Sequence, residues 1–205
     1  MTEVIYMFAM SLDGFIARAE GAVDWLDRFP ADDDYDFPAF LDSLSGIVMG
    51  RDSYEAARRG GGWDYGRWPT LVATRRPVDN LPQGAFTLDA SPAEMLAALA
   101  EQKAGGRVWL FGGGNLVRQF LEAGLLDVVE IGIIPVVLGS GIPAFGGMQA
   151  DRWLDLEHAS PLKNGAIHAR YRVQGRERGE IAGTAGKALT GIDPFAHSPA
   201  NILAS

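Results

Sequence analysis

Residues 108–121, VWLFGGGNLVRQFL, join a short apolar run to three glycines and then to a helical pattern. The run predicts a buried strand, and Leu116, Phe120 and Leu121 fall on one face of the helix that follows. Glycine lets a ligand approach the backbone closely, and a helix N-terminus presents N–H groups to an anion. The segment therefore predicts a pyrophosphate site at a strand-to-helix junction. A tight turn that binds no ligand is the alternative.

A Rossmann dinucleotide fingerprint explains the same segment less well. Gly112 and Gly114 match the first two glycines of G-x-G-x-x-G, but Val117 stands at the third position. Glu130 has nearly the spacing of the ribose-binding acid, yet it lies inside the next predicted strand rather than at its end. The unit also follows several predicted strands instead of opening the domain, so we disfavour this interpretation.

The surrounding sequence predicts an α/β domain. The segment 108–121 is followed by the strand pattern 128–134, and two strands that flank one helix form a right-handed crossover between parallel strands. Ser91, Pro92 and Glu94 form a capping-box pattern at the start of a helix. Further strands are predicted at 4–10, 46–49, 70–74, 85–88 and 166–173, and further helices at 52–58 and after Asp36.

Apolar periodicity fades after Gln174, which sets the expected domain organisation. Residues 1–174 are predicted to form one globular domain, and 175–205 a tail that is poorly ordered or packed on the domain or a partner. We expect this tail to be dispensable for cofactor binding, because the glycine-rich segment and the final strand precede it.

Composition excludes several functional classes. The chain has no cysteine, which rules out disulfides, thiolate metal sites and cysteine nucleophiles. Its net charge of −8 disfavours nucleic-acid binding, and no apolar run approaches the ~18 residues of a membrane span. The N-terminus lacks a basic leader, so we expect a cytoplasmic protein. The three histidines are scattered without ligand spacing, and we predict no metal.

Two further strand ends carry groups that suit phosphate. IVMGRDSYEAARR (47–59) places Arg51 and Ser53 at a helix start, and VATRRP (72–77) ends a strand with two arginines. Six arginines lie in this part of the acidic chain: Arg51, Arg58, Arg59, Arg67, Arg75 and Arg76. Since parallel strands end at a common edge, where α/β proteins bind ligands, these groups predict a small anionic ligand there. Scattered surface arginines are the alternative.

These segments, with SLDGFIA (11–17) and the continuation of the glycine-rich segment to Phe145, resemble the bacterial dihydrofolate-reductase-like group. That group includes the C-terminal reductase domain of the riboflavin-biosynthesis deaminase/reductase. The resemblance covers roughly residues 3–173 and is most specific in the glycine-rich segment. It implies a three-layer α/β/α fold with a mostly parallel central sheet, a last antiparallel strand, and NADPH across the sheet edge.

The resemblance also implies where the cofactor would bind. Ala9 and Ile16 would flank the nicotinamide, and Thr74, Arg75 and Arg76 would hold the adenosine 2′-phosphate. An arginine beside that phosphate is what a preference for NADPH requires. The remaining phosphate contacts would come from Gly50, Arg51, Ser53, Gly112, Gly113, Gly114, Asn115 and Leu116.

The substrate side is less determined by the sequence. In dihydrofolate reductases an acid after the first loop binds the pterin, and Asp32, Asp33, Asp34 and Asp36 compete for that role. We choose Asp34, with a solvated acidic loop as the alternative. Asp13 resembles the substrate-side aspartate of the riboflavin branch, although it also suits a turn aspartate that caps backbone. Aromatic side chains, Trp25 and Phe37 first and also Trp63 and Trp68, would wall a flat substrate or serve as core.

The sequence thus predicts an NADPH-dependent reductase acting on a small pterin-like or pyrimidine-like heterocycle. A nucleotide-binding protein of the same fold without robust catalysis, or a stand-alone riboflavin-pathway reductase, are the alternatives. We also expect a homodimer, because the resembling riboflavin-branch domains commonly pair. The apolar stretch 131–145, IGIIPVVLGSGIPAF, adds a reason in the sequence itself.

Overall fold

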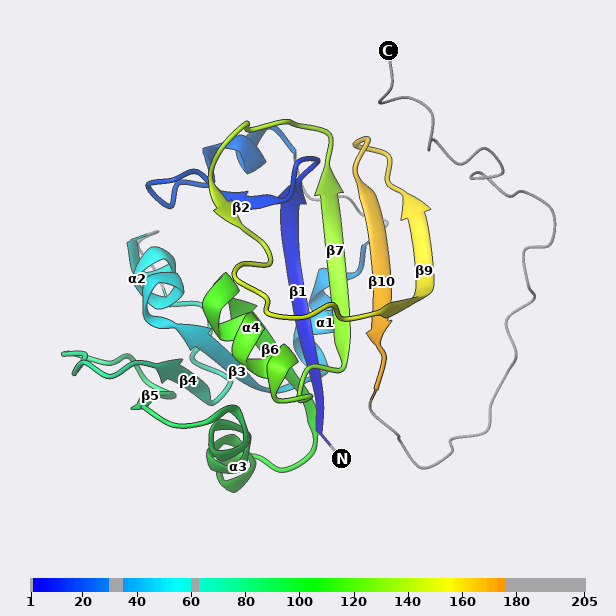
Figure 1. The fold of residues 1–205 in the computed structure, drawn as a ribbon. Coiled ribbons are helices and arrows are strands. Elements are labelled where there is room, and N and C mark those ends of the chain that lie inside the picture. Colours follow the sequence, from blue (N-terminus) through cyan, green and yellow to red (C-terminus); the bar gives the residue numbers. More distant parts are fainter. Residues whose placement is uncertain (1, 30–34, 60–62, 176–205) are drawn as a thin grey trace, which may run out of the picture.

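The computed structural model describes residues 2–29, 35–59 and 63–175, and these form an eight-stranded sheet with helices on both faces (Figure 1). The strand order is β5-β4-β3-β6-β1-β7-β10-β9. The sheet strands are β1 (Thr2–Ser11), β3 (Leu44–Gly50), β4 (Thr70–Ala73), β5 (Ala85–Leu88), β6 (Gly106–Gly112), β7 (Val128–Ile134), β9 (Leu154–Pro161) and β10 (Ile167–Val173). A separate two-stranded pair joins β2 (Phe15–Ala17) to β8 (Ile142–Pro143).

The sheet is parallel from β5 through β7, and β10 runs antiparallel to both β7 and β9. This confirms the predicted mostly parallel sheet with a last antiparallel strand. The edge strand β9 was not predicted. Most of its residues are exposed, so its sequence lacks the apolar alternation that reveals a half-buried strand.

Two helices cover each face of the sheet. α3 (Pro92–Gln102) and α4 (Gly114–Glu122) contribute Met95, Leu99 and Phe120 to a core with the buried side chains of β1, β6 and β7. On the opposite face, Phe40 of α1 (Phe37–Asp42) and Tyr54 of α2 (Arg51–Arg59) pack over a second core (Figure 1). A 3₁₀ helix, η1 (Asp24–Arg28), precedes α1. The expected three layers are therefore present.

Local sequence signals explain where the helices begin. Ser91 Oγ accepts the Glu94 N–H and Glu94 Oε2 accepts the Ser91 N–H, so the predicted capping box starts α3. Asp36 Oδ1 accepts the Ala39 N–H at 2.9 Å and caps α1. Leu44–Met49 of β3 are all buried because this strand is covered on both faces, which explains its continuous apolar run.

Candidate functional site at the carboxyl edge of the sheet

Three strands end side by side at one edge of the sheet. β3 lies between β4 and β6, with Gly50 paired to Ala73 and Met49 paired to Gly112. The glycine-rich segment, the start of α2 and the residues after β4 therefore meet at this edge. The sequence analysis predicted that these three groups lie at one edge of the sheet, and the observed strand register brings the three strand ends together.

The glycine-rich segment lies against the first turn of α2. The Gly112–Gly113 peptide bond is cis, Gly112 has a φ of +133°, and Gly113 is the N-cap of α4. Ser53 Oγ is the nearest atom to a Cβ built on either glycine, at 3.8 Å from Gly112 and 4.0 Å from Gly113. A Cβ on Gly114 would instead lie 3.1 Å from the Pro143 carbonyl oxygen. Gly113 thus borders open space, whereas Gly114 is enclosed by protein.

Asn115 and Leu116 have their side chains engaged within the protein. Asn115 Oδ1 accepts a hydrogen bond from Arg118 at 2.8 Å, and Leu116 is buried in the core. The Leu116 N–H also donates to the Gly113 carbonyl oxygen at 2.9 Å. What this segment can offer an anion is therefore the backbone at the very start of α4, where a helix N-terminus favours negative charge.

Arg51 links α2 to the segment after β4. Its Nη1 donates to the carbonyl oxygens of Arg76 and Pro77 at 3.3 and 3.0 Å, and its Nε donates to Glu55 at 2.7 Å. Thr74 Oγ1 accepts the Arg76 N–H at 3.2 Å, which shapes the turn that exposes Arg75 and Arg76. Two of the predicted phosphate-binding groups are therefore in direct contact.

An open hollow of about 480 Å³ lies between α2 and residues 78–80. It is lined by Arg51, Tyr54, Glu55, Arg58, Arg59, Val78, Asp79 and Asn80. Three arginines against two acids make the hollow basic in a chain that is acidic overall, so it favours an anionic group.

Ala9 and Ile16 lie on β1 and β2, the two strands that flank the turn containing Asp13. Ala9 is on β1, and its side chain packs beside a small core cluster of Trp25, Ile134 and Ala166. Ile16 is half-buried on β2, and β2 pairs antiparallel with β8. Trp25 is 4% exposed and packs with Ile134 and Ala166 in this cluster.

Phe37 is the more accessible of the two aromatic residues first proposed for the substrate. It is 39% exposed, stacks on Phe40 with ring centroids 5.9 Å apart, and meets Trp109 edge-on. Trp68 is buried in the α1–α2 core, and Trp63 packs edge-on against Tyr54 and Tyr65. Phe37 is therefore positioned to border a ligand on the α1 face.

Of the acidic residues predicted for the substrate side, Asp13 is described by the structure and three others are not. Asp32, Asp33 and Asp34 lie outside the described residues. Asp13 accepts the N–H groups of Leu138 and Gly139 at 3.1 and 2.7 Å, and it ties the turn after β1 to the segment after β7. The Ser11 hydroxyl and these N–H groups hold the pKa of Asp13 below its usual range. Asp13 thus has the geometry of a backbone-capping turn aspartate.

A buried carboxylate that the sequence analysis did not select lies on the α1 face of β7. Glu130 is 6% exposed; its Oε1 is 2.9 Å from His168 Nε2, and its Oε2 accepts from Arg170 at 2.6 Å. Burial first, and then the charge and hydrogen bond of Glu130, raise the pKa of Tyr35. The signal that could have found this cluster is the alternation of His168, Arg170 and Arg172 along one strand.

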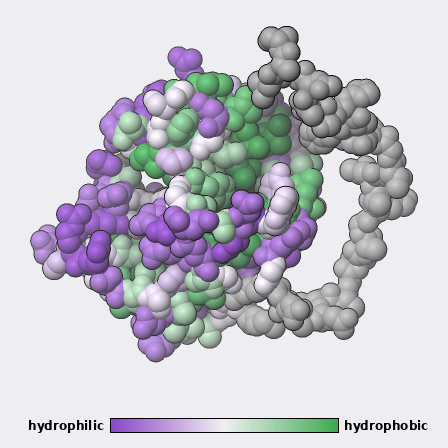
Figure 2. Space-filling model, in the orientation of Figure 1, coloured by the Kyte–Doolittle hydropathy of each residue, from purple (hydrophilic) through white to green (hydrophobic). Residues whose placement is uncertain are grey.

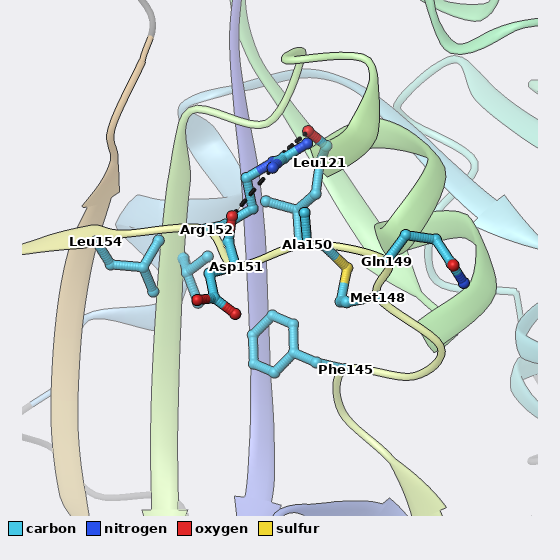
Figure 3. Close-up of a pocket in the computed structure, with 9 residues that line it drawn as sticks. Leu121, Phe145, Met148, Gln149, Ala150, Asp151, Arg152 and Leu154 are labelled. Atoms are coloured by element: carbon cyan, nitrogen blue, oxygen red, sulfur yellow. Dashed lines mark hydrogen bonds between the residues drawn. The ribbon is translucent and has the colours of Figure 1, made fainter.

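A second hollow, of about 360 Å³, lies on the opposite face (Figure 3). It is lined by Leu121, Val129, Phe145, Met148, Gln149, Ala150, Asp151, Arg152 and Leu154. Arg152 Nε donates to the carbonyl oxygen of Leu121 at its rim. This hollow lies between the end of α4 and the 145–154 segment, away from Gly50 and Thr74, and contains none of the predicted site residues.

Two features are absent from the described part of the chain. Within it, no group of three or more His, Cys, Asp or Glu side chains is arranged to hold a metal ion. Over the same residues, no helix has the length and apolar character needed to cross a membrane.

The model of the RibD C-terminal domain matches residues 62–168, more than half of the 205 residues. The chain belongs to the RibD C-terminal domain family. The YwjB protein of Bacillus subtilis (strain 168), whose function is uncharacterized, is 35% identical over 143 residues, covering 69% of this chain and 81% of YwjB. This family membership confirms the expected resemblance to riboflavin-type reductase domains.

Solved structures share the fold. A protein of Shewanella sp. PV-4, provisionally described as a riboflavin biosynthesis protein, superimposes with a TM-score of 0.74 and 25% identity. The match covers 85% of this chain and 100% of the Shewanella chain. Dihydrofolate reductase from Enterococcus faecalis, complexed with NADP(H), gives a TM-score of 0.59 at 17% identity, over 84% and 97% of the two chains. The fold is therefore dihydrofolate-reductase-like.

Proposed function

We propose that this protein is a cytoplasmic NADPH-dependent reductase that transfers a hydride to a small pterin-like or pyrimidine-like heterocycle. The observation that carries the proposal is the meeting of three phosphate-suited strand ends at one sheet edge, in a member of a reductase-type family. A parallel α/β sheet binds its ligands at that edge.

The chain fits a dinucleotide in two places. The open space beside Gly113, the hydroxyl of Ser53 and the start of α4 suit a pyrophosphate, which needs close backbone and N–H donors. Thr74, Arg75 and Arg76 suit the 2′-phosphate, and Arg51, which lines the basic hollow, donates to the carbonyl oxygens of Arg76 and Pro77. Bound NADPH would supply the hydride.

The protein's own contribution would be orientation, exclusion of water and proton supply. Ala9 and Ile16 would border the nicotinamide with small or apolar side chains, and Phe37 would border the substrate ring. Asp34 remains our candidate for the substrate-binding acid. The carboxylate of Asp13 already accepts two backbone N–H groups, so it suits a role in holding the site's loops together.

NADPH oxidation measured against a panel of pterins, pyrimidines and simple carbonyl compounds tests the proposal. The panel should include 5-amino-6-(5-phosphoribosylamino)uracil, the compound for which the reductase of Thermotoga maritima with the same fold is named. We expect one heterocyclic class to accelerate NADPH oxidation well above the rate with protein alone. NADPH binding without acceleration by any compound would favour the non-catalytic alternative.

A further inference from the structure

A gap in the side-chain layer separates Ala9 from His168 on the α1 face of the sheet. Ala9 of β1 pairs with Gly132 of β7, which pairs with His168 of β10. Strands lie about 4.8 Å apart, so the Cα atoms of Ala9 and His168 are about 10 Å apart. A Cβ on Gly132 would have Ala9 Cβ, at 3.9 Å, as its nearest neighbour. Among the described residues, only atoms of Ala9 come within 4 Å of that Cβ, so the side-chain layer is thin at the middle position.

Glu130 holds the imidazole of His168 at one side of this gap. It lies two residues before Gly132 on the same face of β7, and its Oε1 is 2.9 Å from His168 Nε2. Arg170 and Tyr35 also bond to the Glu130 carboxylate, which fixes that carboxylate in turn. Since Nε2 is bonded to Glu130, Nδ1 is the ring nitrogen left for a ligand.

The surroundings of His168 combine aromatic walls with charged groups. The Tyr35 ring lies 5.0 Å from the imidazole, and Phe37 lies 6.5 Å beyond Tyr35. The titratable and charged groups that face His168 are Glu130 on β7, Arg170 on β10, His158 on β9 and Tyr35 before α1. The His168 side chain is 17% exposed, so it is held in place and still reachable.

We propose that His168 is a catalytic proton donor to an imine-bearing heterocycle that lies over Gly132, with Glu130 as its positioning residue. The inference rests on the proposed function, because the nicotinamide is expected beside Ala9. Bound NADPH would supply hydride to the carbon of a ring C=N bond, and the π electron pair of that bond would move to the nitrogen. The nitrogen takes the proton from His168 Nδ1, and solvent returns a proton to the imidazole. NADPH is oxidised to NADP⁺, and the C=N bond is reduced to C–NH.

Proton NMR of the full chain tests the position of the ligand without any cofactor. The sequence has three histidines, so the imidazole region is simple, and the spectrum of His168→Gln identifies the His168 signal. 7,8-Dihydropterin is the probe, as a fused aminopyrimidine with a ring C=N bond. Its addition is expected to move the His168 signal and leave those of His158 and His197 in place. A His168 signal that stays still would overturn the inference.

Turnover tests the donor role with a matched control. His158→Gln removes a neighbouring histidine whose ring lies 5.5 Å from His168, and it should leave dihydropterin-dependent NADPH oxidation within about twofold. His168→Gln should lower kcat by about 100-fold or more while the Kd for NADPH stays within twofold, since general acid catalysis is typically worth ~10²–10⁴-fold. Glu130→Gln should lower kcat more than it raises KM, and Glu130→Asp should recover part of the loss.

The failure of this inference can be told apart from the failure of the proposed function. Wild-type kcat in a folded His168→Gln variant, or no dihydropterin-dependent oxidation by wild-type protein that binds NADPH, would overturn the inference alone. Absence of NADPH binding by the wild type would overturn the proposed function and the donor role with it.

Discussion

Gly113 and Gly114 are adjacent in the sequence but have different surroundings. Gly113 has a φ of −86°, which any residue can adopt, and nothing closer than 4.0 Å would meet its Cβ. We therefore expect Gly113→Ala to fold normally and to raise the Kd for NADPH by about tenfold or more, because the added methyl would occupy the space of the pyrophosphate. Circular dichroism with a fluorescence titration of NADPH separates the two effects.

Gly114→Ala is the matched comparison. Its Cβ would lie 3.1 Å from the Pro143 carbonyl oxygen, so the 143–146 segment must move. Overpacking of this kind costs roughly 1–3 kcal/mol, which corresponds to a lower Tm by about 2–12 °C. If Gly113→Ala leaves NADPH affinity unchanged, the triplet is only a turn.

Arg75 carries the expected discrimination between NADPH and NADH. It is exposed beside Thr74, where a 2′-phosphate would gain a charge-assisted hydrogen bond of about 1.5–3 kcal/mol. Arg75→Ala should therefore weaken NADPH binding by about tenfold or more and leave NADH binding unchanged. Arg152→Ala, on the opposite face, is the control for loss of an arginine. Equal weakening of both cofactors would place Arg75 elsewhere on the dinucleotide.

The sequence predicts the neighbours of the strand-end residues better than it predicts the contact between Glu130 and His168. The glycines, Arg51 and Thr74 follow strands of recognisable pattern, and parallel strands bring their ends to one edge. Glu130 and His168 are 38 residues apart, and their contact depends on the β7–β10 register, which single-residue patterns do not specify. The chemistry of Trp25 suits either a core or a substrate wall, and its burial at 4% exposure could not be predicted from the sequence.

At the scale of elements, Asp13 joins the turn after β1 to the segment after β7. We expect Asp13→Asn to lower the Tm, because one amide oxygen replaces a carboxylate that accepts two N–H groups. Ser11 and these N–H groups lower the folded-state pKa, so the stabilisation is present above the unfolded-state pKa, about 3.9, and is lost as the pH falls through the folded value.

Thermal melts of both proteins between pH 7 and pH 3 measure this effect. The Tm difference should be largest near neutral pH and shrink below about pH 4. An unchanged Tm at pH 7, combined with loss of turnover, would instead indicate that Asp13 acts on the substrate.

Element prediction succeeded where the signal was local. The capping box of α3 lies within four residues, and β3 contains the apolar run 46–49 because both its faces are covered. The edge strand β9 was missed because its side chains are mostly exposed, so its sequence has no apolar alternation. It is a strand because it pairs with β10. The short β2–β8 pair likewise depends on residues more than 120 positions apart.

For the whole molecule, an uncovered apolar surface supports our expectation of a homodimer. Val137, Trp153 and Leu156 are 67%, 72% and 58% exposed, and Ile142, Phe145 and Ile167 are also exposed. Hydrophobic residues gather over β7 and β10 in Figure 2, where no helix covers the sheet in Figure 1. A second copy would bury such a surface favourably.

Light scattering at tens of micromolar, a rough working concentration, should give twice the chain mass of 22.0 kDa. Trp153→Ser should shift the protein toward the monomer without changing NADPH affinity. A wild-type monomer under these conditions would contradict the expectation.

The central claim is that the carboxyl edge of this sheet binds NADPH through its 2′-phosphate and pyrophosphate. Parallel fluorescence titrations of the wild-type chain with NADPH and NADH test it most directly. The account predicts saturable binding of one NADPH per chain, about tenfold or more tighter than NADH, as one charge-assisted hydrogen bond implies. Equal or tighter affinity for NADH would contradict the role given to Thr74, Arg75 and Arg76, and no binding of either would contradict the site itself.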